Sequence, residues 1–278
     1  MIVPGVCSKR QARETALSDG TQPIDPLAVP GVADPFSEDL LLGGKVRLRQ
    51  PLDGYRAAID PVLLAASVSA TPGQRVLEAG TGHGAAAICL ARRVADCSVT
   101  GIEIQPDLVR LANDNARLNG LAGSVQVMIG DLVRPLPRVA AGGFDHVMAN
   151  PPYLEAARAD ASPEAARAAA NVEGEAGLDV WLSFMLRMVR PKGTITLIHR
   201  ADRLDDILTL LAGQAGELTV FPIWPKQGRA AKRIIVRARK GIRTPMSLSP
   251  GLVMHEEDGA YTAAADEILR GGPNPIRT

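Results

Sequence analysis

Short apolar runs alternate with amphipathic stretches from residue 75 to residue 211. The apolar runs have the length and aliphatic character of buried strands, and the stretches between them repeat apolar residues at helical spacing. Strands are expected at 75–79, 98–104, 125–129, 144–149 and 194–198, and helices at 84–93, 106–119, 178–189 and 203–211. This alternation predicts an α/β fold with a parallel sheet that helices cover on both faces. The apolar stripe of the helix at 178–189, which includes Trp181, is expected to belong to the core.

The pattern changes after the last of these helices. Two further strands, expected at 218–224 and 233–238, follow one another with only a short loop between them. Consecutive strands joined by a short loop pair in antiparallel fashion. The sheet is therefore expected to end in an antiparallel hairpin, and residues 241–278 follow it as a C-terminal extension without an assigned role.

Two segments precede the main domain, which we place at residues 71–240. Residues 1–37 are rich in proline and poor in bulky apolar side chains, which predicts a disordered tail. Residues 38–70 read as two short strands around a Gly-Gly turn, followed by a helix that begins at Asp60 and Pro61. Asp is a favoured N-cap residue and proline suits the first helical position.

Composition and charge narrow the class of protein. The 278 residues are 46% hydrophobic and 22% charged, which is globular, and a formal net charge of +1 leaves nucleic-acid binding to local clusters of charge. No apolar run reaches the length of a membrane span, and the first residues make a poor signal peptide. Three cysteines and four histidines, widely spaced, predict neither a disulfide framework nor a metal site. A cytoplasmic protein is expected.

The first candidate site is the sequence Val76-Leu-Glu-Ala-Gly-Thr-Gly-His-Gly84, where an expected strand ends and a helix begins. Gly80, Gly82 and Gly84 allow the backbone to approach a ligand closely, and the helix N-terminus adds positive potential. Glu78 precedes them on the strand. The order G-x-G-x-G differs from the G-x-G-x-x-G order of dinucleotide-binding folds. A nicotinamide dinucleotide is therefore the less favoured ligand.

Two acidic residues follow the next two strands. Glu103 closes the strand at 98–104, where a carboxylate can accept hydrogen bonds from both hydroxyls of a ribose. Asp131 follows the strand at 125–129 and can accept a hydrogen bond from an adenine amino group or stabilise a turn. The glycine motif nearby favours the ligand interpretation for both residues.

The sequence Asn150-Pro-Pro-Tyr153 directly follows the strand at 144–149 and carries the most specific chemistry. Pro151 and Pro152 fix the backbone and remove two N–H donors, which leaves carbonyl groups pointing outward. With the side-chain oxygen of Asn150 they form an acceptor pair for a planar NH2 group, while Tyr153 offers an aromatic face to a flat substrate. Positioning and electrostatics would then activate the amino nitrogen for attack without a strong base.

These motifs together resemble those of the class I S-adenosylmethionine-dependent N-methyltransferases. More narrowly, residues 52–65, Leu-Asp-Gly-Tyr-Arg-Ala-Ala-Ile-Asp-Pro-Val-Leu-Leu-Ala, resemble the substrate-side segment of the tRNA1(Val) (adenine-37-N6)-methyltransferase family. The resemblance covers roughly residues 38–240. It implies a Rossmann-like fold with a seven-stranded, mostly parallel sheet and an antiparallel C-terminal hairpin.

The same resemblance implies an activity and assigns roles to the motif residues. S-adenosylmethionine would donate a methyl group to the exocyclic N6 of an adenine in RNA, with tRNA as the partner. The target base would lie at residues 150–153. The methyl donor would be bound by Glu78, Gly80, Gly82, Gly84, Glu103 and Asp131.

A basic loop favours RNA as the substrate. From residue 218 to residue 255 the chain has eight Lys or Arg residues and no Asp or Glu. The loop between the two late strands carries four of them, which are candidate phosphate contacts: Lys226, Arg229, Lys232 and Arg233. A solvated loop whose charges protect an edge strand would have a similar composition.

Three other functions are weighed against RNA methylation. A glutamine side chain also presents an amide NH2 group, so a protein glutamine N5-methyltransferase would use the same acceptor pair. A non-catalytic S-adenosylmethionine-binding module is disfavoured by the intact sequence at 150–153. A nicotinamide-dependent dehydrogenase is disfavoured by the order of the glycines and by the lack of a matched acid–base pair.

Overall fold

The computed structural model describes residues 36–52, 56, 58–134, 136–152 and 177–276. Residues 1–35, most of the expected tail, lie outside the described residues, as does Tyr153. Strand β1 begins at Phe36, two residues before the segment expected to start at residue 38.

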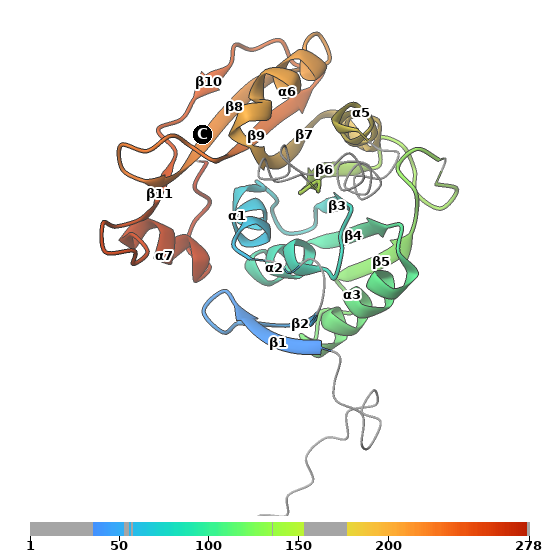
Figure 1. Cartoon of the computed structure of the whole chain (residues 1–278). Helices are drawn as coiled ribbons and strands as arrows, with labels where there is room; N and C mark the ends of the chain where they lie inside the picture. The colour runs from blue at the N-terminus through green and yellow to red at the C-terminus, as the bar shows by residue number, and fades with distance from the viewer. Residues whose placement is uncertain (1–35, 53–55, 57, 135, 153–176, 277–278) are drawn as a thin grey trace, which may run out of the picture. The chain divides into compact units, whose positions relative to one another are not determined.

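Strands and helices alternate through the main domain as the hydrophobic pattern predicts (Figure 1). The strands are β1 (Phe36–Leu41), β2 (Val46–Pro51), β3 (Arg75–Ala79), β4 (Ser98–Glu103), β5 (Val125–Ile129), β6 (Phe144–Ala149), β7 (Val189–Arg200), β8 (Ala215–Lys226), β9 (Arg233–Lys240), β10 (Ser247–Leu248) and β11 (Leu252–His255). The helices are α1 (Asp60–Ser67), α2 (Ala85–Arg93), α3 (Pro106–Leu118), α5 (Leu178–Met188), the 3-10 turn η2 (Ala201–Arg203), α6 (Leu204–Leu211) and α7 (Ala263–Leu269).

The large sheet has the strand order β10-β8-β9-β7-β6-β3-β4-β5, and β11 also pairs with β8. Strands β3 to β7 are parallel to one another, while β9 runs antiparallel between β7 and β8. The expected seven-stranded core with its antiparallel hairpin is thus confirmed. Strands β10 and β11 pair with β8 in parallel, so the C-terminal extension enlarges the sheet to nine strands.

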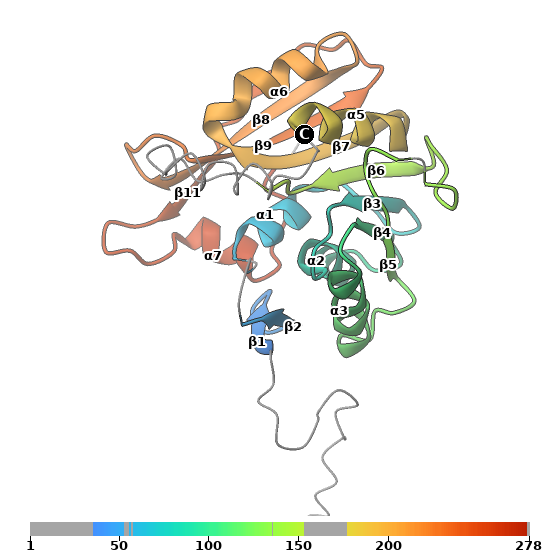
Figure 2. The ribbon, with the colours of Figure 1, turned by 45° about the vertical axis from the view of Figure 1, so that its right-hand side comes forward.

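Helices cover both faces of the sheet, and successive strand residues point to opposite faces (Figure 2). Val76 of β3 and Met148 of β6 belong to the core that α1, α2, α3 and α7 cover. Leu77 and Val147 belong to the core beneath α5 and α6. Burial on both faces explains why these strands read as continuous apolar runs.

Strand β7 begins five residues earlier than expected. It follows α5 at Val189, and its pairing with β6 shifts register between Phe144↔Val189 and His146↔Thr194. The intervening stretch includes Lys192, whose φ is +61°. An irregular stretch of this kind can accommodate a proline, which explains how the Pro-Lys-Gly sequence at 191–193 lies within a strand.

The β1–β2 hairpin is attached to the main domain by Asn115 of α3 and by Asn119, which caps the C-terminus of this helix. The Asn119 side chain accepts from the N–H of Arg47 at 2.9 Å and donates to its carbonyl at 2.7 Å. Asn115 makes the same pair of bonds with Arg49, at 2.9 Å each, and also donates to the carbonyl of His83. Two side-chain amides therefore replace a neighbouring strand along β2 and tie the hairpin to the glycine loop.

Candidate functional site

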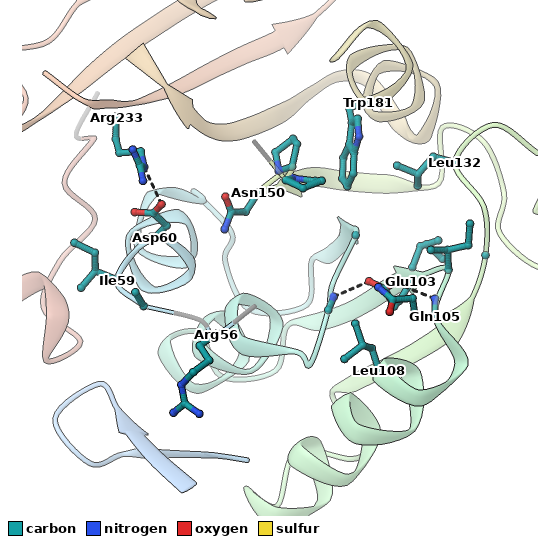
Figure 3. Close-up of a pocket in the computed structure, with 18 of the residues that line it drawn as sticks. Arg56, Ile59, Asp60, Glu103, Gln105, Leu108, Leu132, Asn150, Trp181 and Arg233 are labelled. Atoms are coloured by element: carbon teal, nitrogen blue, oxygen red, sulfur yellow. Dashed lines mark hydrogen bonds and ion pairs between the residues drawn. The ribbon is translucent and has the colours of Figure 1, made fainter. Parts of the chain in front are cut away.

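A cavity of about 990 Å³ opens where the carboxyl ends of β3, β4, β5 and β6 meet. Ligands of open α/β sheets bind at this edge, because the loops after the strands converge there. Each of the four sequence motifs contributes to its lining (Figure 3), through Gly80, Gly82, Glu103, Gly130, Asp131, Asn150, Pro151 and Pro152.

The glycine loop forms the floor of the cavity. Gly80 has a φ of +62°, and a Cβ atom placed on it would lie 2.2 Å from Cη2 of Trp181. Gly80 therefore lets the Trp181 ring pack directly against the backbone. Gly84 has a different role from the expected one: it caps α2, where a Cβ atom would lie 3.3 Å from Ala112 of α3, and it does not line the cavity.

Glu78 does not line the cavity either, in contrast to its expected place beside the methyl donor. Its buried carboxyl group accepts from the Thr81 hydroxyl at 2.5 Å and from the N–H of Ala87 at 3.0 Å. These bonds fasten the glycine loop to the first turn of α2. Burial is the largest influence on this carboxyl group and raises its pKa to about 8, so Glu78 retains its proton near neutral pH.

The raised pKa predicts how stability depends on pH. Between pH 4.5 and 8 the folded chain keeps a proton on Glu78 that the unfolded chain releases. The contribution is complete below pH 4.5 and is lost as the pH rises through about 8, so the free energy of unfolding falls by up to about 1.4 kcal/mol per pH unit in between. We expect Glu78→Gln to remove this decline, as measured by denaturant unfolding from pH 5 to 9. Identical profiles for both proteins would show that Glu78 is ionised throughout.

Glu103 lies at the end of β4 with its carboxylate at the cavity wall. One oxygen accepts from the N–H of Gly82 at 2.9 Å and the other from the N–H of Gln105 at 3.0 Å. A carboxylate offers about four acceptor positions, so about two remain for a ligand. This agrees with the predicted role of Glu103 as the acceptor of two ribose hydroxyls.

Asp131 stabilises a turn, and its contact with an adenine amino group stays a prediction. It lines the cavity, and it also stabilises the turn after β5 by accepting from the N–H of Val133 at 3.0 Å. Its other oxygen lies 3.2 Å from Nε of Arg134. The apolar side chains of Ile104 and Val133 also line the cavity and are 61% and 44% exposed. They offer apolar surface to a flat ring next to the two carboxylates.

Asn150 follows β6 and lies between the glycine loop and α1 (Figure 3). Pro151 is buried and Pro152 is exposed, and both line the cavity beside Asn150. The Asn-Pro-Pro residues predicted from the sequence therefore line the same cavity as Glu103.

The cavity wall beside Asn150 carries an ion pair that the sequence did not predict. Nε of Arg233, the first residue of β9, lies 3.0 Å from a carboxylate oxygen of Asp60, the first residue of α1 (Figure 3). The four basic residues of the loop therefore differ in their surroundings. Arg233 and Lys232 line the cavity, Lys226 donates to the carbonyl of Glu257, and Arg229 is exposed.

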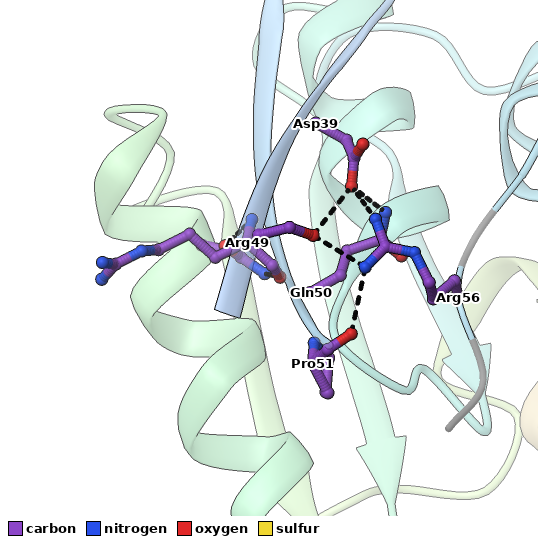
Figure 4. A network of polar contacts seen from close by, with 7 residues as sticks. Asp39, Arg49, Gln50, Pro51 and Arg56 are labelled. Atoms are coloured by element: carbon purple, nitrogen blue, oxygen red, sulfur yellow. Dashed lines mark hydrogen bonds and ion pairs between the residues drawn. The ribbon is translucent and has the colours of Figure 1, made fainter. Parts of the chain in front are cut away.

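Arg56 also reaches the cavity wall, and a network of polar contacts holds it there (Figure 4). Its guanidinium lies 2.6 Å from a carboxylate oxygen of Asp39 and donates to the carbonyl of Pro51 at 3.1 Å. Gln50 donates to the same Asp39 oxygen at 2.8 Å. The β1–β2 hairpin therefore contributes to the site by holding the Arg56 side chain in place.

Three parts of the lining were missed by the sequence analysis. Trp181 was assigned to the core and is indeed 8% exposed, but it also faces the cavity. Nothing in the sequence around Trp181 indicates that its ring packs against Gly80. Met254 and His255 come from β11, in the extension that had no expected role. Ile104 could have been found as an apolar residue directly after a strand-end carboxylate.

Comparison with known proteins agrees with this geometry. Residues 76–177 match the family model described as a methyltransferase domain. A crystal structure described as a predicted O-methyltransferase from Agrobacterium tumefaciens superposes with a TM-score of 0.66 and 25% identity, over 79% of this chain and 99% of that one. The chain carries an S-adenosylmethionine-dependent methyltransferase domain.

Two curated relatives align with most of this chain. The protein of Aeromonas hydrophila is 29% identical over 212 residues, which is 74% of this chain and 85% of the relative. That of Porphyromonas gingivalis strain ATCC 33277 is 28% identical over 222 residues, 74% of this chain and 84% of the relative. Both are named tRNA1(Val) (adenine(37)-N6)-methyltransferase.

The residues around the cavity fit S-adenosylmethionine. Gly80 and Gly82 bring bare backbone to the floor, Glu103 would hold the ribose hydroxyls, and the apolar side chains of Ile104 and Val133 would flank the adenine ring. Within the described parts of the chain, no helix is long and apolar enough to span a membrane. The same parts hold no group of three His, Cys, Asp or Glu side chains suited to a metal ion.

Proposed function

We propose that this methyltransferase acts on the exocyclic N6 of an adenine in tRNA and works in the cytoplasm. One observation carries the reaction class: the Asn150-Pro-Pro sequence and Glu103 line the same cavity. The names of the curated relatives support tRNA, and adenine 37 of the valine tRNA, as the target. The basic residues beside the cavity support an RNA substrate.

The residues of the chain would position the amino group rather than deprotonate it. When bound, S-adenosylmethionine supplies an electrophilic methyl group. The side-chain oxygen of Asn150 and the backbone carbonyl beside it would accept hydrogen bonds from the two N6 hydrogens, which raises electron density on nitrogen and aims its lone pair into the cavity. The proton that N6 loses on methylation would pass to the solvent. Trp181 and the glycine loop would exclude water from this space.

The target base must leave its stack to reach Asn150. Unstacking costs least in a single-stranded loop, so an anticodon loop is a suitable substrate. The cavity of about 990 Å³ has room for more than the donor alone. Asp60 and Arg233 face the side of the cavity that Asn150 occupies, and they would bound the space for the base (Figure 3).

The function can be tested with an unmodified transcript of the valine tRNA, labelled donor and nucleoside mass analysis. We expect N6-methyladenosine from this transcript and none from a transcript in which adenosine 37 is replaced by guanosine. A glutamine-containing peptide should accept no label. Methylation of the peptide, with none of the RNA, would replace the proposal with protein glutamine methylation.

The basic loop yields a separate prediction about RNA affinity. Arg229→Ala with Lys232→Ala should weaken tRNA binding and flatten the dependence of log affinity on log salt by about 1.4, at about 0.7 for each lost contact to a single strand. Arg233 is left intact because its loss would remove the ion pair with Asp60. Filter binding over a salt series measures the slope.

The matched control is Arg110→Ala with Arg117→Ala, two exposed arginines of α3 that do not line the cavity. Its slope should equal that of the parent. A flattened slope in the control, or an unchanged slope in the loop variant, would contradict the role of the loop.

A further inference from the structure

The C-terminal extension builds one wall of the cavity. Strand β11 pairs with β8 in the register Leu252↔Ile223 and His255↔Lys226. This pairing places Met254 and His255 in the lining of the same cavity as Asn150. The extension therefore lies on the substrate side of the site, next to the basic loop.

His255 is stacked against a second aromatic ring. Its ring centroid lies 4.9 Å from that of Tyr261, with 22° between the ring planes. The two residues also form an antiparallel β-bridge across a tight turn, in which the N–H of Glu256 donates to the carbonyl of Ala260 at 2.9 Å. The stack is thus held by the backbone as well as by the rings.

Tyr261 is 42% exposed although its ring is stacked on His255. The chain has only nine aromatic residues, and among the described ones Tyr261 is the only one whose side chain is exposed. An exposed ring beside a cavity has an apolar surface that a second flat ring can cover.

We infer that the stack of His255 and Tyr261 is a platform for a nucleobase that adjoins the target adenine, an inference that rests on the proposed RNA substrate. Removing the target base from its stack leaves the neighbouring bases without a partner on one face. An aromatic side chain can replace that partner, and it does so for any base because every base has a π-face.

The charges around the platform distinguish base contact from phosphate contact. The turn that holds the stack carries Glu256, Glu257 and Asp258, all exposed, which repel phosphate groups. Lys232 and Arg233 line the cavity, and Lys226 lies opposite His255 in the β8–β11 register. The backbone of the RNA would therefore follow the basic loop, while a base turns toward Tyr261.

The first test compares Tyr261→Ala with Tyr261→Phe, which keeps the ring. We expect Tyr261→Ala to raise KM for the tRNA about tenfold with kcat and donor affinity little changed, while Tyr261→Phe resembles the parent. The control is Leu248→Ala, a 70% exposed apolar residue on β10 of the same extension that does not line the cavity. Thermal unfolding checks that each variant is folded.

The second test removes the base instead of the ring. Stem-loop RNAs carry an abasic nucleotide on one side or the other of the target adenosine. For one of these RNAs, the KM of the parent should rise about tenfold above its value for the intact RNA. The KM of Tyr261→Ala should be the same for this RNA as for the intact RNA. Additive losses, or a Tyr261→Ala variant that equals the parent on intact tRNA, would overturn the platform and leave the RNA substrate standing. A parent that methylates peptide and no RNA would overturn both.

Discussion

Asn150→Ala is expected to lower kcat by about 10²- to 10³-fold, the range measured when a single oriented polar group is removed from a transition-state site. Asn150 lines the cavity, and neither of the two hydrogen bonds that hold Glu103 involves it. Donor affinity, measured by calorimetry, should therefore stay at the parent value. The loss belongs to the chemical step because the amino group is no longer oriented.

The matched variant is Asn150→Asp, which keeps an acceptor oxygen in nearly the same shape. It should retain more activity than Asn150→Ala, although the added charge lies on the same wall as Asp60. A purely structural role for Asn150 would lower the stability and donor affinity of both variants together. Near-parent turnover of Asn150→Ala would remove Asn150 from the reaction.

The parallel core could be predicted because local and global preferences agree there. Strands buried on both faces show up as short apolar runs, and parallel strands need helical connections, so the pattern of elements determines the sheet. The same reasoning brings the motifs together. Gly80, Glu103, Asp131 and Asn150 each lie at or just after the end of a strand, and parallel strands end at one edge.

Contacts between distant segments could not be predicted. The ion pair of Arg233 and Asp60 joins residues 173 positions apart, and it converts an apparent phosphate contact into part of the cavity wall. Trp181 lies against the glycine loop at the cavity only because Gly80 has no side chain. No periodicity or local motif encodes either contact, since both depend on how the finished sheet places its loops.

Glu78 shows a different limit. Its position just before the glycine motif suggested contact with the methyl donor, yet its carboxyl group accepts hydrogen bonds from Thr81 of the loop and from Ala87 of α2. A sequence motif records that a residue type is required, but it does not separate a residue that touches the ligand from one that shapes the loop around it. Gly84, which lets α2 approach α3, is a second example.

Glu103→Ala is expected to weaken S-adenosylmethionine binding by about 2 kcal/mol, or about 30-fold, because hydrogen bonds to a charged acceptor are lost. The variant also leaves the N–H of Gly82 without its acceptor, which loosens the glycine loop. Glu103→Gln keeps one acceptor oxygen for Gly82 and should lose less. Asp107→Ala, an exposed carboxylate of α3 that pairs with Arg110, is the control and should bind the donor as the parent does. Calorimetric titration decides the matter: equal affinity for the parent and Glu103→Ala would place the ribose elsewhere in the cavity.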